Sequence, residues 1–154
     1  MKYRIILFII LSLLLIFTSF NCGDKNEKEL EGYEGESVNP MTNKGIGPIK
    51  NVSLIDIDNI RAEKGKSIFE MKCSACHKVD EKVVGPNLAD VTKRRTPEWI
   101  LNMILNSKEM LESDPIAMEL LSVYLTQMPY QNISENEAMD VLEYFRQHDS
   151  KIKK

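Results

Sequence analysis

Two cysteines lie three positions apart near the middle of the chain, and a histidine directly follows the second, in Cys73-Ser74-Ala75-Cys76-His77. Two thiols and an imidazole this close in sequence must share one short turn. Such a cluster binds a metal or a cofactor, or it forms a disulfide. The rest of the chain has to build its core around whatever the cluster holds.

The same spacing is that of covalent haem c attachment, in which two thiols form thioethers with the haem vinyl groups and His77 ligates the iron. A redox disulfide usually opens a helix after a strand, whereas a helical stripe precedes this motif. A zinc site needs two more ligands, and only His148 and Cys22 remain. A structural disulfide would not need the histidine. We therefore expect one covalent haem c, bound by Cys73 and Cys76 with His77 as an iron ligand.

The N-terminus has the layout of an export signal. Lys2 and Arg4 precede an uncharged, largely apolar run over residues 5–20. Since this run is shorter than the roughly 20 residues of a comfortable membrane span, a retained anchor is the second choice. Cys22 follows and resembles the acylated cysteine of bacterial lipoproteins. We expect a signal peptide over 1–21, a lipid on Cys22 and a location on the periplasmic face of a membrane, outside the cytoplasm, where bacteria attach haem c.

Residues 22–44 are rich in Glu, Lys, Asn and Gly and show no apolar period. This composition predicts a flexible linker, with a solvated surface segment as the alternative, and leaves 45–154 as the folded domain. The chain has 20 Lys and Arg against 23 Asp and Glu, and its net charge changes from −3 to −5 if residues 1–21 are removed. Because nucleic-acid binding relies on clustered basic residues, we expect no nucleic-acid partner. We expect a monomer.

Four segments have helical signals, and none alternates as a strand would. The expected N-caps are Asp58, Thr96, Asp114 and Ser134; a proline follows the second and third, and Glu137 completes a capping box with the last. The apolar stripes are Ala62, Gly65 and Phe69; Trp99, Ile100, Met103 and Ile104; Ile116, Leu120, Val123 and Tyr124; and Ala138, Val141, Leu142 and Phe145. The prediction is an all-α domain of about four short helices.

A second iron ligand is expected opposite His77. Met128 is the best candidate because Met128-Pro129 lies in a loop, where the backbone can bend to bring a sulfur to iron. Met103 and Met118 lie at apolar helix positions and are expected to fill the core. Met110, on a connector, is a second choice, and His148 is expected to be a solvated residue at a helix end.

From about Glu63 to Gln147 the sequence resembles the class I cytochrome c family. Gly65 and Phe69 ahead of the cysteine motif are similar to the family's N-terminal helix, which crosses a C-terminal helix at positions matched by Val141 and Tyr144. The resemblance implies a small class I cytochrome c fold around one covalently bound haem. It also implies an electron carrier, not an enzyme.

The resemblance further implies roles for single residues. Val84-Gly85-Pro86-Asn87-Leu88 is similar to a family stretch whose proline carbonyl, here that of Pro86, accepts a hydrogen bond from the ligand histidine. Met128 corresponds to the ligand methionine. Trp99, Arg94 and Arg95 resemble the residues that bind the haem propionates, although Lys93-Arg94-Arg95 can also be read as a solvated basic segment.

The implied function is transfer of single electrons between respiratory-chain components, with a quinol-oxidising complex and a terminal reductase or oxidase as partners. Lys72, Lys78, Lys82 and Lys93 flank the motif segments and could steer an acidic partner, although acidic residues lie among them. The runs 45–48 and 91–99 resemble lipoprotein cytochromes associated with nitrous-oxide reduction. The alternative function is a haem sensor or a peroxidase-like enzyme with an exchangeable sixth ligand.

Overall fold

The structure, a computed structural model, describes residues 38–152. The predicted signal peptide (1–21), the predicted lipidation site Cys22 and the linker up to residue 37 lie outside the described residues. Within 38–152, no helix is both long enough and apolar enough to span a membrane.

All regular secondary structure between residues 38 and 152 is helical, so the all-α prediction is confirmed. The helices are α2 (Asn59–Lys72), α3 (Val91–Arg94), α4 (Pro97–Leu105), α5 (Ser107–Ser113), α6 (Pro115–Tyr124) and α7 (Glu135–Lys151). These are six helices where about four were expected. The two extra ones, α3 and α5, have 4 and 7 residues, which is too short for an apolar period to show in the sequence.

The four predicted N-caps all form. Asp58 accepts hydrogen bonds from the backbone N–H groups of Ile60 and Arg61, and Asp114 accepts one from that of Ala117. The Thr96 hydroxyl likewise accepts the backbone N–H of Trp99. At the start of α7, Ser134 and Glu137 form the complete capping box. Each cap satisfies backbone N–H groups that have no partner inside the helix.

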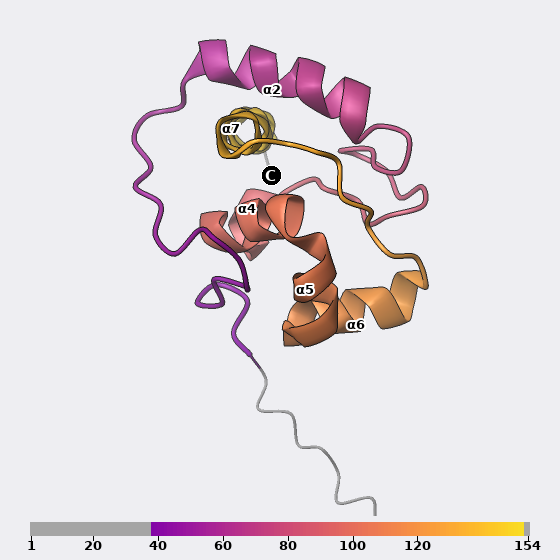
Figure 1. Cartoon of the computed structure of the whole chain (residues 1–154). Helices are drawn as coiled ribbons and strands as arrows, with labels where there is room; N and C mark the ends of the chain where they lie inside the picture. Colours follow the sequence, from indigo (N-terminus) through magenta and orange to yellow (C-terminus); the bar gives the residue numbers. More distant parts are fainter. Residues whose placement is uncertain (1–37, 153–154) are drawn as a thin grey trace, which may run out of the picture. The chain divides into compact units, whose positions relative to one another are not determined.

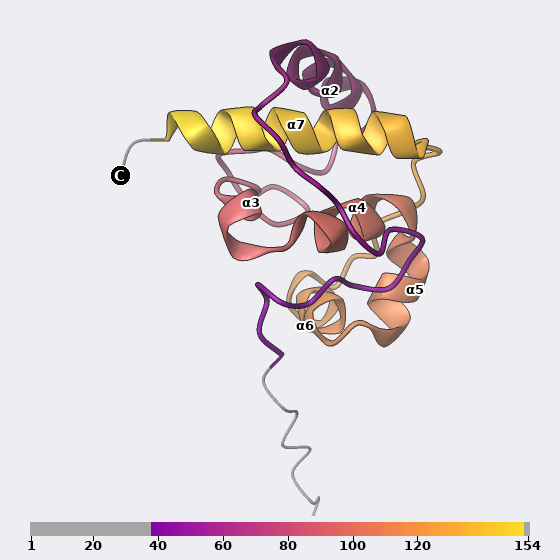
Figure 2. The ribbon, with the colours of Figure 1, turned by 90° about the vertical axis from the view of Figure 1, so that its left-hand side faces the viewer.

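Helix α2 lies across α7, and α7 lies between α2 and α4 (Figures 1 and 2). At the crossing, a Cβ atom built on Gly65 would lie 1.9 Å from the carbonyl oxygen of Asp140, so only glycine permits this approach. One turn further along α2, the ring of Phe69 lies 5.6 Å from those of Tyr144 and Phe145. The predicted crossing of the two helices is confirmed.

Before α2, the chain runs past α4 and α7 as an extended strap, defined as residues 43–58 (Figure 2). Buried Asn102 holds it by accepting the Ile49 N–H and donating to the carbonyl oxygens of Lys44 and Ile49, all at 2.9 Å. The Thr96 hydroxyl also donates to the Asn43 carbonyl at 2.6 Å. The ordered contacts of the domain therefore begin before residue 45, the boundary expected from composition.

Helix α6 differs from its prediction at two positions, Met118 and Val123. Ile116 is buried, but Val123, expected to face inward, is 60% exposed. Met118, expected to fill the core, is 48% exposed and also wrong. The reason is that α6 packs along one side only: Ile116 and Ala117 are buried and Leu120 and Tyr124 are half-buried, whereas Met118 and Val123 are exposed.

Substituting Gly65 by alanine tests the crossing. Alanine in a helix interior normally gains about 1 kcal/mol over glycine. Here the added methyl group would meet the Asp140 carbonyl, so we expect Gly65→Ala to lower the free energy of unfolding by about 1–3 kcal/mol in denaturant titrations. Lys66→Ala on the exposed side of α2 is the control and should change stability by less than about 0.5 kcal/mol. Equal or greater stability of Gly65→Ala would contradict the close approach.

The capping box predicts a pH dependence. Hydrogen bonds from the Ser134 backbone and hydroxyl, and from Lys72, lower the pKa of Glu137 below its usual value. A lowered pKa in the folded state stabilises the fold above the ordinary glutamate pKa, and this stabilisation disappears as the pH falls through the folded-state pKa. Wild type should therefore be more stable than Glu137→Gln at neutral pH, and the difference should shrink in acid.

Denaturant unfolding of both proteins across a pH series measures this difference. Glu135→Gln is the control, because the Glu135 carboxylate lies in the same helical turn and makes no hydrogen bond within residues 38–152. Its pH-dependent difference from wild type should be smaller. If the difference in free energy of unfolding between wild type and Glu137→Gln stays constant into strong acid, the charge of the Glu137 carboxylate is not the source of the stabilisation.

Candidate functional site

The cysteine motif forms a tight turn directly after α2. Cys73 is the C-cap of α2, and its carbonyl oxygen accepts the backbone N–H groups of Cys76 at 3.1 Å and His77 at 2.9 Å. This turn places Cys73, Cys76 and His77 in the wall of an apolar cavity. The two thiols are half-buried and not joined to each other. Burial raises the pKa of the Cys73 thiol to about 11, against a lowering effect of neighbouring Lys72, so this thiol is neutral at physiological pH.

The imidazole of His77 is held from behind by residues 84–88. Its Nδ1 lies 3.4 Å from the Pro86 carbonyl oxygen, a long hydrogen bond in which nitrogen donates. A Cβ atom on Gly85 would lie 2.3 Å from Cε1 of the ring, so glycine allows the loop to close on it. Burial lowers the pKa of His77, although the Pro86 contact opposes this shift. The ring is thus neutral, with Nε2 as the nitrogen left to bind a ligand.

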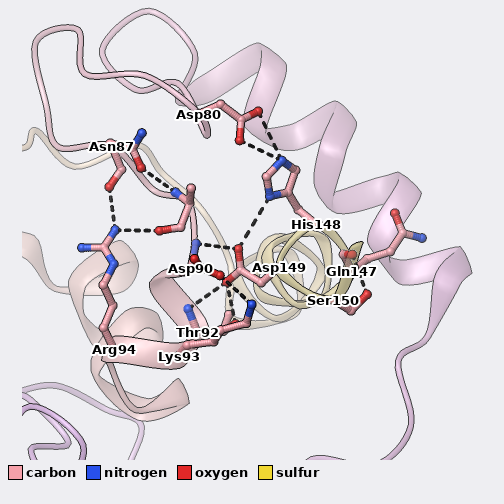
Figure 3. Close-up of polar contacts among 11 residues, drawn as sticks. Asp80, Asn87, Asp90, Thr92, Lys93, Arg94, Gln147, His148, Asp149 and Ser150 are labelled. Carbon is pink, nitrogen blue, oxygen red and sulfur yellow. Dashed lines mark hydrogen bonds and ion pairs between the residues drawn. The ribbon is translucent and has the colours of Figure 1, made fainter. Parts of the chain in front are cut away.

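The segment between His77 and α4 is fixed to the end of α7 (Figure 3). Buried Asp149 accepts the backbone N–H of Asp90 at 2.8 Å, and the N–H and hydroxyl of Thr92 at 3.0 and 2.6 Å. Its neighbour His148 lies with Nε2 3.2 Å from an Asp80 carboxylate oxygen and is only 23% exposed, so the expectation of a solvated histidine is wrong. These contacts hold both ends of the loop that carries Pro86.

One cavity joins all of these elements. It has a volume of about 230 Å³, several times the volume of a water molecule, and its lining is mostly apolar. Each of the six helices within residues 38–152 contributes at least one residue to its wall. All eight predicted cavity residues, which sequence reasoning drew from four separate stretches, line it: Cys73, Cys76, His77, Pro86, Arg94, Arg95, Trp99 and Met128.

The four candidate methionines divide clearly. Met128, half-buried in the connection between α6 and α7, lines the cavity, as does Met103 of α4. Met110 is fully buried in α5, away from the cavity, and its sulfur accepts the Ile46 N–H at 2.9 Å. Met118 is outside the cavity lining and half exposed. Two thioethers therefore reach the cavity, and only Met128 does so from a segment without regular structure.

The Trp99 indole has a different partner from the predicted one. Its Nε1 donates to the buried carboxylate of Asp114 at 3.0 Å. Asp114 also caps α6 and accepts the Asn43 side-chain amide at 2.7 Å. The expected role required an indole N–H directed at a haem propionate, and here that N–H is used within the protein. The ring itself still lines the cavity.

The two arginines lie at the edge of the cavity. Arg94 donates to the carbonyl oxygens of Asn87 and Ala89 at 2.7 and 3.1 Å, which braces the loop after Pro86 (Figure 3). The guanidinium of Arg95 lies 5.2 Å from the centre of the Trp99 ring, a cation–π contact. Burial and the charge of Arg94 lower the pKa of Arg95. Both side chains keep N–H groups that could bind a carboxylate.

The predicted lysine group is only partly free. Lys72 and Lys93 form ion pairs with Glu137 and Asp90 at 3.3 and 2.6 Å, and Lys82 lies 4.7 Å from the centre of the Tyr124 ring. Lys78 is exposed, and its side chain makes no hydrogen bond or ion pair within residues 38–152.

The donor set suits a covalently bound haem. Two unpaired thiols, a neutral imidazole and two thioethers line one apolar cavity, and two arginines lie at its edge. Within residues 38–152, no three His, Cys, Asp or Glu side chains gather to hold a metal ion directly, so the zinc alternative lacks its further ligands. The free thiols also give no support to a structural disulfide.

The comparisons with known proteins agree with this geometry. A family model described as cytochrome c matches residues 62–149. A solved cytochrome c from Rhodothermus marinus has 43% identity and a TM-score of 0.66, covering 68% of this chain and 90% of its own. An engineered form of that protein, bound to a carbene intermediate, has 42% identity and a TM-score of 0.63, covering 68% and 91%. A cytochrome c domain from Pseudomonas putida has 26% identity and a TM-score of 0.50, covering 56% and 89%.

Proposed function

The chain belongs to the cytochrome c family, and from this we propose that it carries single electrons between respiratory-chain components on the periplasmic side of a membrane. Members of the family transfer electrons and bind haem c covalently, and Cys73, Cys76 and His77 form the attachment motif. One observation carries the proposal: the motif and Met128 line the same apolar cavity.

Met128 is proposed as the second axial ligand. Haem iron supplies a one-electron redox centre, and a thioether on it favours the reduced state and raises the reduction potential. A filled sixth position excludes small molecules and keeps the site similar in both oxidation states. The protein supports this by holding His77 as the neutral ring through Pro86 and by closing apolar side chains around the cavity. Arg94 and Arg95 are proposed to bind the haem propionates.

The partners are proposed to be a quinol-oxidising complex as donor and a terminal reductase or oxidase as acceptor. Val83 and Val84, 45% and 43% exposed, precede Pro86, and Val84 lines the cavity. Lys78 and Lys82 lie in the same loop. An apolar edge flanked by lysines suits a transient complex with an acidic partner, in which charge speeds the encounter. The resemblance of residues 45–48 and 91–99 to cytochromes of nitrous-oxide reduction points to a reductase of that class as one acceptor.

A lipid on Cys22, after removal of residues 1–21, is proposed to hold the monomeric domain at the membrane. The apolar run before Cys22 and the polar residues after it support this arrangement. It would keep the carrier close to both membrane partners.

The second candidate function is a haem protein with an exchangeable sixth ligand, such as a sensor or a peroxidase-like enzyme. Two observations favour keeping it. The connection that carries Met128 has no regular secondary structure, and the engineered Rhodothermus marinus cytochrome c binds a carbene intermediate.

Carbon monoxide binding separates the two functions. If Met128 occupies the sixth position, the reduced protein should bind carbon monoxide slowly, because the sulfur must leave first. Met128→Ala should bind it at least tenfold faster, which corresponds to an activation barrier lower by about 1.4 kcal/mol or more. Stopped-flow absorption measures both rates. Met118→Ala, at an exposed position outside the cavity, is the control and should match wild type. Fast uptake by wild type itself would support the sensor or enzyme instead.

The anchor is tested by changing its cysteine. We expect Cys22→Ser, expressed from the full chain in a bacterium that attaches haem c, to lose the lipid and move from the membrane fraction to the soluble periplasmic fraction or to remain as an unprocessed precursor. Mass spectrometry of the mature N-terminus identifies an acyl chain on wild type. A wild-type chain that retains residues 1–21 and stays membrane-bound as Cys22→Ser would favour the retained span.

A further inference from the structure

The segment that carries Met128 has little support of its own. This Met128 segment, residues 125–133, connects α6 to α7 without regular secondary structure. Leu125 and Asn132, near its two ends, have left-handed backbones, with φ of 53° and 49°. Leu125 and Tyr130 are 83% and 65% exposed, and only Ile133 is fully buried. Packing at its C-terminal end therefore fixes the segment more than contacts near the methionine do.

One hydrogen bond joins the Met128 segment to a distant element. Lys72 Nζ donates to the Asn132 carbonyl oxygen at 2.9 Å. Within residues 38–152, the other hydrogen bonds of the segment are local: Leu125 N–H to the Leu121 carbonyl, and the Gln131 side chain to the Pro129 carbonyl. The Lys72 bond is thus the one polar tie between this segment and the helix that ends in the cysteine motif.

The position of Lys72 gives this bond its importance. Lys72 is the last residue of α2, directly before Cys73, and its side chain lines the cavity. Its ammonium group also lies 3.3 Å from Glu137 Oε1. Glu137 is itself fixed, because its other carboxylate oxygen accepts the Ser134 N–H at 2.8 Å and hydroxyl at 2.9 Å. The lysine is therefore held on both sides, between the attachment motif and the start of α7.

The hydrogen bond from Lys72 to Asn132 is strong enough to influence the position of the Met128 segment. The Lys72 and Glu137 side chains are 30% and 37% exposed, so the ion pair is partly screened by water. A charged donor to a carbonyl oxygen is stronger than a neutral hydrogen bond. With no second polar tie, its loss cannot be compensated by a neighbouring bond.

We propose that Lys72 is a positioning residue for Met128: its bond to the Asn132 carbonyl holds the Met128 segment against the helix that carries the haem, and so lowers the fraction of molecules in which the sulfur leaves the iron. This inference rests on the proposed function, because it assumes that Met128 is an iron ligand. It assigns Lys72 a role inside the site, separate from any contact with a redox partner.

The test uses the haem-loaded protein without a partner. Lys72→Met removes the ammonium group and keeps most of the apolar stem. Lys72→Arg keeps a charged donor. Lys78→Met removes the same charge just beyond the motif, from a side chain that makes no hydrogen bond to the Met128 segment, and controls for electrostatics. The readouts are the rate of carbon monoxide uptake by the reduced protein, the reduction potential, and amide hydrogen exchange over residues 125–133.

We expect Lys72→Met to take up carbon monoxide roughly three- to tenfold faster than wild type, which is what loss of one charged hydrogen bond at a partly exposed site would give. Amide exchange in residues 125–133 should accelerate by a similar factor. The reduction potential should fall further than in Lys78→Met, since the thioether is bound less of the time. Lys72→Arg should restore most of the wild-type behaviour.

The outcomes separate this inference from the proposed function. If Met128→Ala opens the iron but Lys72→Met takes up carbon monoxide and exchanges amides like Lys78→Met, the positioning role is overturned and the carrier function stands. If wild type takes up carbon monoxide as fast as Met128→Ala, the ligand assignment and the positioning role are both overturned. Faster uptake in Lys72→Met without faster exchange in residues 125–133 would also overturn the role, because the effect would then not act through this segment.

Discussion

The close crossing of α2 and α7 is the constraint on which the site depends. Gly65 lets the two helices approach until backbone meets backbone at Asp140. Helix α2 ends in the cysteine motif, and α7 begins just after the segment that carries Met128. This one helix contact therefore sets where both halves of the donor set begin. A shift at the crossing would move Cys73 and the start of α7 relative to each other, because Cys73 directly follows α2 and α2 meets α7 at this crossing.

Short helices leave many backbone groups without partners, and buried polar side chains satisfy them here. Asn102 hydrogen-bonds the backbone of the strap, and Asp149 accepts backbone N–H groups at the start of α3. Asp114 accepts a backbone N–H of α6 and the indole N–H of Trp99. Each is at most 2% exposed. A buried side chain with several hydrogen bonds is costly to leave unpaired, so these residues define the connections as firmly as apolar packing defines the helices.

The sequence allowed accurate prediction wherever a signal was local. The caps at Asp58 and Thr96 and the stripe through Phe69 depend on neighbours within one or two turns, and the structure confirms them. The partners of Trp99 and Met110 could not be predicted, because they are polar contacts between residues 15 and 64 positions apart and leave no period in the sequence. The contacts of the strap could not be predicted for the same reason, because the side chains that hold it lie on α4, α5 and α7, between 46 and 91 positions away.

The two sides of the proposed iron site are held unequally. His77 directly follows Cys76, whose thiol the haem would fix covalently. The loop that packs against the His77 ring comes close because Gly85 has no side chain, and the C-terminal end of this loop is anchored by hydrogen bonds to Asp149. The Met128 side has one distant hydrogen bond, from Lys72. Local opening follows the weaker attachment, so exchange of a ligand would occur on the methionine side. If Met128 binds the iron as proposed, electron carriage and small-molecule binding differ in one quantity, the fraction of time that the Met128 segment is open, and the Lys72 hydrogen bond lowers that fraction.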